Sequence, residues 1–229
     1  VRNRTADVGE AVPNVPRMTT ATFWNGIAED YARKPISNPD AFERKIERTI
    51  ALMKPTDHVL EIGCGTGSLA LRLAPHAGTY HGLDISSEMV RIAREKTEGM
   101  ENLSFSTGPF DRSFTKYPAH SVDMICAYSI LHLVDDGPDA FANMYRLLKP
   151  GGYLVASTVC LGGSLIPFGP LLTVMRWVGK APNVRLVDIA ELEDEAKTAG
   201  FIDIEHLDVG AKPTIDFMIA RKPDGDTRR

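Results

Sequence analysis

The chain has 229 residues, of which 43% are hydrophobic and 24% are charged, and its formal net charge is −4 at pH 7. This length fits a single α/β domain with a covering element, and the apolar content is enough for a buried core. Nucleic-acid-binding proteins usually carry a basic face, so the acidic balance argues against a nucleic-acid partner. No apolar run approaches the ~20 residues of a membrane span. The N-terminus also lacks the apolar core of a signal peptide.

The three cysteines favour reduced thiols over disulfides or a metal site. Cys64, Cys126 and Cys160 are odd in number, lack Cys-x-x-Cys spacing, and lie in or beside apolar strand runs. No cluster of histidines and acidic residues in the sequence has metal-ligand spacing, so we expect no metal. Together these features predict a cytoplasmic protein without stable membrane insertion. The sequence leaves the oligomeric state open, and a homodimer is one possibility.

Two helices are predicted ahead of the first strand. Residues 1–20 are polar, show no hydrophobic period, and are expected to be mobile. Thr22 is a candidate N-cap for the first helix. The apolar positions of this helix recur at helical spacing: Phe23, Ile27, Ala28 and Tyr31. A second helix is predicted to start at Asn38-Pro39, a side-chain cap followed by proline at the first helical position.

From residue 58 onward, strand-like and helix-like segments alternate. Strands are predicted near 58–62, 79–84, 103–107, 121–127 and 152–159, and helices near 67–75, 86–97 and 137–148. This alternation predicts right-handed βαβ units, and therefore a parallel sheet covered on both faces. Asp188 then predicts the start of a helix that ends at Gly200. Residues 201–209 and 214–220 are predicted to be two strands that pair as an antiparallel hairpin, because only a few residues separate them.

The most informative segment is the glycine-rich turn after the first strand, which reads Val59-Leu60-Glu61-Ile62-Gly63-Cys64-Gly65-Thr66-Gly67. A turn with so few side chains lets a ligand lie against the backbone, and the helix that follows directs N–H groups at it. Glu61 adds a carboxylate just before the first glycine. Asp84 ends the next predicted strand, 21 residues after Gly63. That spacing puts a carboxylate where the ribose of a nucleoside cofactor would lie. Both of its oxygens can accept hydrogen bonds from the ribose hydroxyls.

The glycine spacing separates two classes of cofactor. A nicotinamide-binding turn reads Gly-x-Gly-x-x-Gly or ends in alanine, whereas this chain has Ser68 at the last position. The pattern Glu-x-Gly-x-Gly-x-Gly instead resembles the first motif of class I S-adenosylmethionine-dependent methyltransferases. Three later segments resemble further motifs of that family in order: Leu83-Asp84-Ile85-Ser86 with Met89, then Val122-Asp123-Met124-Ile125, then Leu147-Leu148-Lys149-Pro150-Gly151-Gly152. The resemblance covers roughly residues 22–222.

The resemblance implies a Rossmann-like, doubly wound sheet of seven strands, mostly parallel with an antiparallel last strand. It implies one domain over residues 21–222, preceded by the N-terminal segment and followed by a short tail, 223–229. Segment 161–184 interrupts the alternation, and its apolar positions recur at helical spacing. Because open α/β sheets bind ligands beyond the carboxyl ends of their strands, we predict that 161–184 is a helical lid over the ligand site.

The cofactor that the resemblance implies is S-adenosyl-L-methionine. The residues predicted to bind it are Tyr31, Glu61, Gly63, Cys64, Gly65, Gly67, Asp84, Ile85, Met89, Gly108, Pro109, Phe110 and Tyr128. Many members of the family have Gly-Asp-Ala after the third strand, and the carboxylate of this aspartate accepts a hydrogen bond from the adenine amino group. Here Pro109 occupies that position, so we expect backbone groups and stacking on Phe110 to hold the adenine. Asp111 is a candidate substitute for the missing acid.

Two residues after the fourth strand are candidates for catalysis. Tyr128 and His132 lie in the segment that, in the family, lines the methionine end of the cofactor and the acceptor. A histidine between leucines is more often structural, and that alternative stays open beside a general-base role. The predicted function is methyl transfer to a small, partly apolar acceptor. A nicotinamide-dependent oxidoreductase and a non-catalytic S-adenosylmethionine-binding module are the alternatives.

Overall fold

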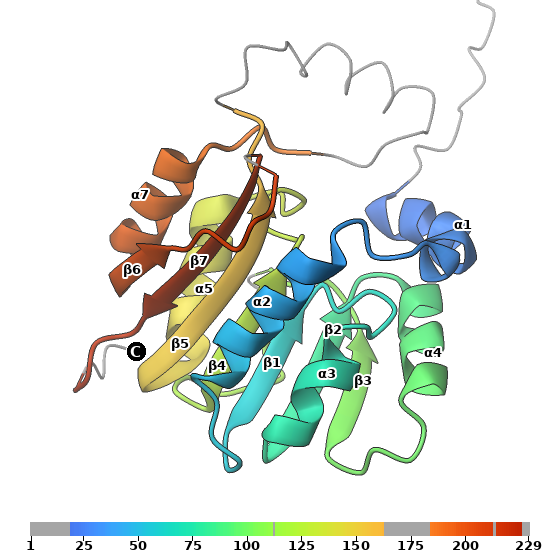
Figure 1. Ribbon diagram of the computed structural model, residues 1–229. Coiled ribbons are helices and arrows are strands. Elements are labelled where there is room, and N and C mark those ends of the chain that lie inside the picture. Colours follow the sequence, from blue (N-terminus) through green and yellow to red (C-terminus); the bar gives the residue numbers. More distant parts are fainter. Residues whose placement is uncertain (1–18, 112, 163–183, 213, 226–229) are drawn as a thin grey trace, which may run out of the picture.

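The computed structural model describes residues 19–111, 113–162, 184–212 and 214–225, which form one seven-stranded sheet with helices on both faces (Figure 1). The strands are β1 (His58–Ile62), β2 (Thr79–Asp84), β3 (Leu103–Thr107), β4 (Val122–Tyr128), β5 (Leu148–Val159), β6 (Ile202–His206) and β7 (Ile215–Arg221). Their order is β3-β2-β1-β4-β5-β7-β6. β7 pairs antiparallel with β5 and β6, and the other neighbours pair in parallel. The predicted fold is confirmed.

The described helices surround this sheet as the alternation predicts. They are α1 (Thr20–Arg33), α2 (Pro39–Ile50), α3 (Ala70–Leu73) with the short 3-10 helix η1 (Ala74–His76), α4 (Ser87–Lys96), α5 (Gly137–Leu147) and α7 (Ile189–Ala199). Asn38 caps α2 as predicted, accepting the Ala41 N–H at 3.1 Å. None of the described helices is long and apolar enough to cross a membrane.

The predicted cap of the first helix is wrong. Thr19 caps α1, and its hydroxyl oxygen accepts the N–H of Thr22 at 3.2 Å. The helix therefore begins at Thr20, inside the segment that was expected to be mobile; residues 1–18 lie outside the described residues. An N-cap hydroxyl accepts from an amide two or three residues further on. Two threonines spaced by three positions both suit that pattern, so the sequence alone does not separate them.

Two apolar clusters bury the two faces of the sheet. On one face α5 and α7 share a cluster with strand residues that include Leu60 and Ile125. On the other face α2, α3 and α4 share a cluster with Val59 and Met124. Successive side chains of a strand point to opposite faces. The apolar runs that predicted strands therefore also explain why both faces are covered.

α1 lies against α4 near the ends of the parallel strands (Figure 1). Ala28 of α1 is buried in a small apolar cluster with Met89 and Ile92 of α4. Asn25 Oδ1 also accepts the Ser86 hydroxyl at 2.7 Å, at the N-terminus of α4. These contacts bring α1 beside the turn that follows β2, and so beside the predicted cofactor site.

The predicted lid, 161–184, lies outside the described residues except at its ends, so the lid prediction stays untested. The chain before and after it is fixed by backbone hydrogen bonds. The Gly162 N–H donates to the Val187 carbonyl at 2.9 Å, and the Arg185 N–H donates to the His132 carbonyl at 2.8 Å. The segment between therefore leaves and rejoins the fold close to the loop that follows β4.

Candidate active site

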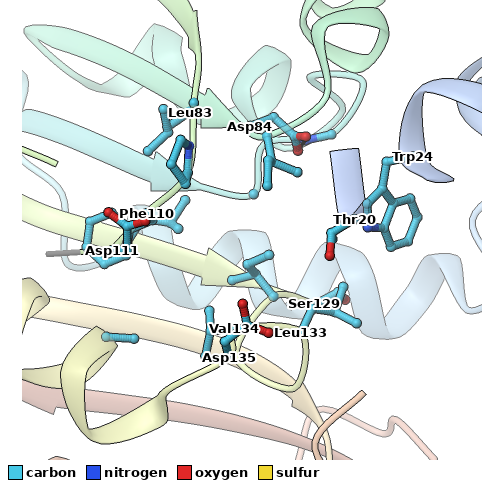
Figure 2. Close-up of a pocket in the computed structure, with 18 of the residues that line it drawn as sticks. Thr20, Trp24, Leu83, Asp84, Phe110, Asp111, Ser129, Leu133, Val134 and Asp135 are labelled. Carbon is cyan, nitrogen blue, oxygen red and sulfur yellow. Dashed lines mark hydrogen bonds between the residues drawn. The ribbon is translucent and has the colours of Figure 1, made fainter. Parts of the chain in front are cut away.

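A cavity of about 240 Å³ lies where β1, β2, β3 and β4 end, beside α1. In Figure 2, Thr20 and Trp24 of α1 lie at one end of the cavity, Phe110 and Asp111 lie at the opposite end, and Asp84 lies between them. The facing wall comes from the loop after β4 and the first turn of α5: Ser129, Ile130, Leu133, Val134, Asp135, Asp136 and Asp139. Open α/β sheets bind their ligands at this edge, and ligand sites combine apolar walls with a few placed polar groups.

The carboxylate of Asp84 is hydrogen-bonded to two loops, the glycine turn after β1 and the turn after β2. Its Oδ2 accepts the N–H of Gly65 at 2.8 Å, and its Oδ1 accepts the N–H of Ser86 at 2.8 Å. Burial raises the pKa of Asp84, and these two hydrogen bonds oppose that rise. A carboxylate has about four lone-pair positions, so each oxygen can still accept a hydroxyl of a ribose.

The glycines of the turn serve two different purposes. Gly65 has φ +51°, lines the cavity, and leaves open space where a Cβ would stand, with no described atom within 4 Å. Gly67 has φ +76° and faces α4 instead, where a Cβ would stand 3.0 Å from the Cβ of Ala93. The open approach at Gly65 fits a ligand that lies on the backbone, whereas Gly67 lets the loop pack on the helix.

Most residues predicted to bind the cofactor lie around this cavity. The lining includes Tyr31, Gly63, Gly65, Asp84, Ile85, Met89, Gly108, Pro109, Phe110 and Tyr128. Asp111, the candidate substitute for the missing acid, lines it too, and its side chain accepts the Ser113 N–H at 2.8 Å. Their individual roles remain predictions. What the structure establishes is that these side chains and turns meet in one place.

Three predicted cofactor residues lie outside the described lining: Glu61 near the end of β1, and Cys64 and Gly67 in the glycine turn. Glu61 is only 2% exposed and accepts the Tyr80 hydroxyl at 2.9 Å. Burial raises the pKa of Glu61 to about 8, so its carboxyl group is mainly protonated at neutral pH. Burial likewise raises the pKa of the Cys64 thiol well above its usual value. These side chains support the turn from inside the sheet.

Tyr128 lines the cavity with its hydroxyl turned toward α2. The phenol oxygen lies 2.7 Å from Thr49 Oγ1, and the Thr49 hydroxyl donates its single proton to the Lys45 carbonyl at 2.8 Å. The phenol also lies 3.3 Å from the Lys45 carbonyl, so its proton is donated inward, to Thr49 or to that carbonyl. Burial raises the pKa of Tyr128 well above its usual value. Tyr128 is thus suited to shape the cavity wall and unsuited to accept a proton from a substrate.

His132 is half-buried and lies outside the described lining. Burial lowers the pKa of its imidazole to about 4, so the ring is neutral near pH 7. Its buried Nδ1 has no hydrogen-bond partner in the described part of the chain. The structure therefore does not bring the two predicted catalytic residues, Tyr128 and His132, together around the cavity.

Several lining residues escaped the sequence analysis. Thr20 reaches the cavity from the first turn of α1, inside the segment that was expected to be mobile. Asp136 lines the cavity and caps α5, accepting the Asp139 N–H at 3.0 Å. The acidic run with a following proline, Asp135-Asp136-Gly137-Pro138-Asp139, was a visible capping signal right after the fourth strand. For Thr20 the sequence held no comparable signal.

Known proteins match this chain. A methyltransferase domain family matches residues 60–156. Phosphoethanolamine N-methyltransferase 1 of Zea mays is 33% identical over 110 residues, covering 47% of this chain and 22% of that protein. Ubiquinone biosynthesis O-methyltransferase of Coxiella burnetii is 32% identical over 102 residues, covering 44% and 43%. This chain therefore spans less than half the length of either relative.

A solved structure shows the same fold. Phosphoethanolamine N-methyltransferase 2 of Haemonchus contortus, in complex with phosphomonomethylethanolamine and S-adenosylhomocysteine, has a TM-score of 0.70 at 19% identity, covering 92% of this chain and 60% of that one. The open approach at Gly65 and the spare lone pairs of Asp84 fit a nucleoside cofactor. The motifs, the sheet order and the matched methyltransferase domain all agree with S-adenosylmethionine as the cofactor. Residues 60–156 therefore form a methyltransferase domain, and the chain resembles the class I S-adenosylmethionine-dependent methyltransferases in its motifs and its fold.

Proposed function

We propose that this protein transfers a methyl group from S-adenosylmethionine to a small, partly apolar acceptor. The observation that carries the proposal is the arrangement of the cavity walls. Asp84 and the open face of Gly65 lie on one wall, and the apolar side chains of Ile130, Leu133 and Val134 lie on another. The first wall suits the nucleoside. The second offers an acceptor apolar surface to cover, at about 25 cal/mol per Å².

The chemistry needs little from the protein beyond placement. S-adenosylmethionine brings an activated methyl group: the lone pair of the acceptor attacks the methyl carbon, the carbon–sulfur bond breaks, and S-adenosylhomocysteine leaves. Holding both reactants in line supplies on the order of 7–11 kcal/mol of the barrier. The hydroxyl of Tyr128 donates inward, and His132 lies outside the described lining, so neither is placed to take a proton from the cavity. This arrangement favours an acceptor that attacks without deprotonation by either side chain, such as a neutral amine.

The charges of the cavity bear on the acceptor class. The described lining contains aspartates, among them Asp84, Asp111 and Asp136, and no lysine or arginine. A phosphomonoester would meet like charges there. We therefore consider phosphoethanolamine, the compound in the name of the Zea mays relative, a less favoured acceptor than a neutral or cationic molecule.

The experiment is a mass-resolved screen of cell extract with the purified protein and S-adenosylmethionine. We expect an ion one methylene heavier than its precursor, which shifts by three further mass units when the cofactor carries a trideuterated methyl group. The Asp84→Ala variant is the matched control. Cofactor binding without any labelled product would favour the non-catalytic binding module, and tight NAD binding would favour the oxidoreductase. The cytoplasmic location, the oligomeric state and the absence of a nucleic-acid partner remain predictions.

A further inference from the structure

α1 forms one end of the cavity, although it packs against the rest of the described protein chiefly through α4. Thr20, Trp24 and Tyr31 of α1 line the cavity, and Figure 2 shows Thr20 and Trp24 at one end of it. The apolar cluster that joins the two helices is small, and Ala28 is its fully buried member from α1. The position of this end of the cavity therefore depends on how firmly α1 is held against α4.

The side chain of Asn25 makes a polar contact between the two helices. Its Oδ1 accepts the Ser86 hydroxyl at 2.7 Å and the Glu88 N–H at 3.3 Å. Ser86 is the N-cap of α4, and Glu88 lies in its first turn. Because a backbone N–H can only donate, the atom that faces Glu88 must be the carbonyl oxygen of Asn25 and not its amide nitrogen. Asn25 thus gives α4 a second acceptor at its N-terminus, where backbone amides have no partner within the helix.

Ser86 connects this contact to the carboxylate of Asp84. Its N–H donates to Asp84 Oδ1 at 2.8 Å, and its hydroxyl donates to Asn25 while accepting the Met89 N–H at 3.1 Å. Ser86 is fully buried, so its hydroxyl would be left without an acceptor if Asn25 moved away, which costs free energy. Two consecutive hydrogen bonds therefore join the carboxylate that we expect to bind ribose to the helix that forms one end of the cavity.

A second polar contact between the two helices lies at the surface. Arg91 of α4 pairs with Glu29 of α1, and it also pairs with Glu88 and Glu95 of its own helix. The side chains of Arg91 and Glu29 are 42% and 61% exposed, so water and salt weaken their attraction. The hydrogen bonds of Asn25 reach a buried partner instead, and we expect them to hold α1 more strongly than this ion pair does.

We propose that Asn25 is a positioning residue, which fixes α1 at the N-terminus of α4 and so holds Thr20 and Trp24 in place as a wall of the cofactor cavity. Asn25 itself lies outside the described lining. The inference shares S-adenosylmethionine with the proposed function and does not depend on the acceptor. When α1 leaves α4, one end of the cavity is open, and only the molecules with α1 in place bind the cofactor at full strength. Loss of the Asn25 acceptor should therefore weaken cofactor binding while the lining residues stay the same.

The test measures S-adenosylhomocysteine affinity by isothermal titration calorimetry in the wild type and three variants. Asn25→Ala removes the acceptor of two hydrogen bonds and should lower the affinity about tenfold. Asn25→Asp keeps an acceptor oxygen in the same place, and a carboxylate suits the N-terminus of a helix, so its affinity should stay within about threefold of the wild type. Glu29→Gln is the matched control on the same pair of helices and should change the affinity less than about twofold.

Hydrogen–deuterium exchange of the unliganded proteins shows where the substitution acts. The amides of α1 should exchange faster in Asn25→Ala than in the wild type, because this helix leaves α4 more often. The amides of β1 and β4 should exchange at the wild-type rate, since the sheet does not depend on α1. Asn25→Asp should restore the slower exchange of α1.

Three results would overturn the proposal. Unchanged affinity in Asn25→Ala would show that the contact with α4 does not support cofactor binding. An equal loss in Asn25→Asp would show that the acceptor oxygen is not the group that matters. Faster exchange throughout the sheet in Asn25→Ala would make Asn25 a residue of general stability. A failure to find any methyl acceptor leaves this pattern of affinities unaffected, so the two proposals fail separately.

Discussion

The Oδ2 atom of Asp84 lies 2.8 Å from the backbone nitrogen of Gly65, so the carboxylate at the end of β2 is bonded to the turn at the end of β1. The two strands belong to one βαβ unit and are parallel neighbours, with Ile62 paired to Leu83. The group that we expect to bind ribose therefore also shapes the surface under the cofactor. Binding and local stability are coupled through this one side chain.

Asp84→Ala should lower both cofactor affinity and stability. Two hydrogen bonds to ribose, each worth about 1.5–3 kcal/mol, would be lost, so calorimetry should show at least a tenfold weaker S-adenosylhomocysteine complex. The amides of Gly65 and Ser86 would also lose their acceptor. Asp208→Ala is the matched control, because Asp208 accepts the Gly210 N–H at 2.8 Å outside the cavity. It should affect stability alone; unchanged affinity in Asp84→Ala would sink the ribose assignment.

Two substitutions in the glycine turn should separate an effect on cofactor affinity from an effect on stability. Alanine at Gly65 meets open space and costs about 1–2 kcal/mol for its positive φ, but its methyl group occupies the cavity. Alanine at Gly67 adds a clash with Ala93 to a similar backbone cost. Urea unfolding should therefore show the larger loss for Gly67→Ala. The loss of S-adenosylhomocysteine affinity per unit of stability lost should be larger for Gly65→Ala, and the reverse order would contradict these roles.

Acid should destabilise the protein through His81. This ring is buried, lies within 2.8 Å of the hydroxyls of Ser104 and Ser106, and its Nε2 is 2.9 Å from Lys116 Nζ. Burial, and then the charge of Lys116, lowers the pKa of His81 to about 4. The unfolded chain binds this proton near pH 6.5, so stability is lost as pH falls from about 6.5 through 4.

His81→Gln should flatten that acid limb, because glutamine keeps hydrogen-bonding groups and does not titrate. The measurement is the urea midpoint at several pH values for both proteins. His132, whose pKa burial also lowers to about 4, contributes in the same window. The slope should therefore shrink without vanishing, and identical slopes would show that His81 does not control it.

Alkali should act through Glu61 with the opposite sign. The folded-state pKa of about 8 lies above the usual 4.5, so the folded protein holds a proton that the unfolded chain releases. The stability from this group is complete below pH 4.5 and is lost as pH rises through 8. Glu61→Gln should then be more stable than the wild type near pH 8, by on the order of 4 kcal/mol, and nearly equal to it near pH 4.5. Calorimetry on the same variant shows whether Glu61 touches the cofactor, since unchanged affinity would exclude it.

The framework of the site could be predicted because it depends on short-range spacing. One crossover helix between β1 and β2 brings Asp84 beside Gly65, and the predicted bounds of both strands match the structure. The loop ends at Gly108 and Tyr128 meet the same cavity for the same reason. Parallel strands have their carboxyl ends at one edge, so motifs at strand ends converge there.

The remaining features depend on contacts between distant parts of the chain. Thr20 reaches the cavity because Asn25 joins α1 to the start of α4, a contact 61 residues long in sequence. Ser129 has a left-handed backbone conformation and a hydrogen bond to β5, and the neighbouring sequence does not indicate this conformation. His132 matched a motif position, yet its ring lies outside the described lining. Motif matches locate a loop, whereas packing decides which side chains of it face the ligand.

The two hydrogen bonds that flank residues 163–183 are made by backbone atoms, from Gly162 to Val187 and from Arg185 to His132. They use no side chain, although Gly162 itself is constrained, because a Cβ there would stand 2.9 Å from the Leu186 carbonyl oxygen. The entropy of closing a loop grows only slowly with its length. Residues 163–183 could therefore be replaced by another sequence between these two hydrogen bonds. The hydrogen bond between Gly65 and the carboxylate of Asp84 does not involve them and would stay unchanged. Chimeras joined at these positions would test whether the intervening residues set the acceptor preference while the cofactor site stays unchanged.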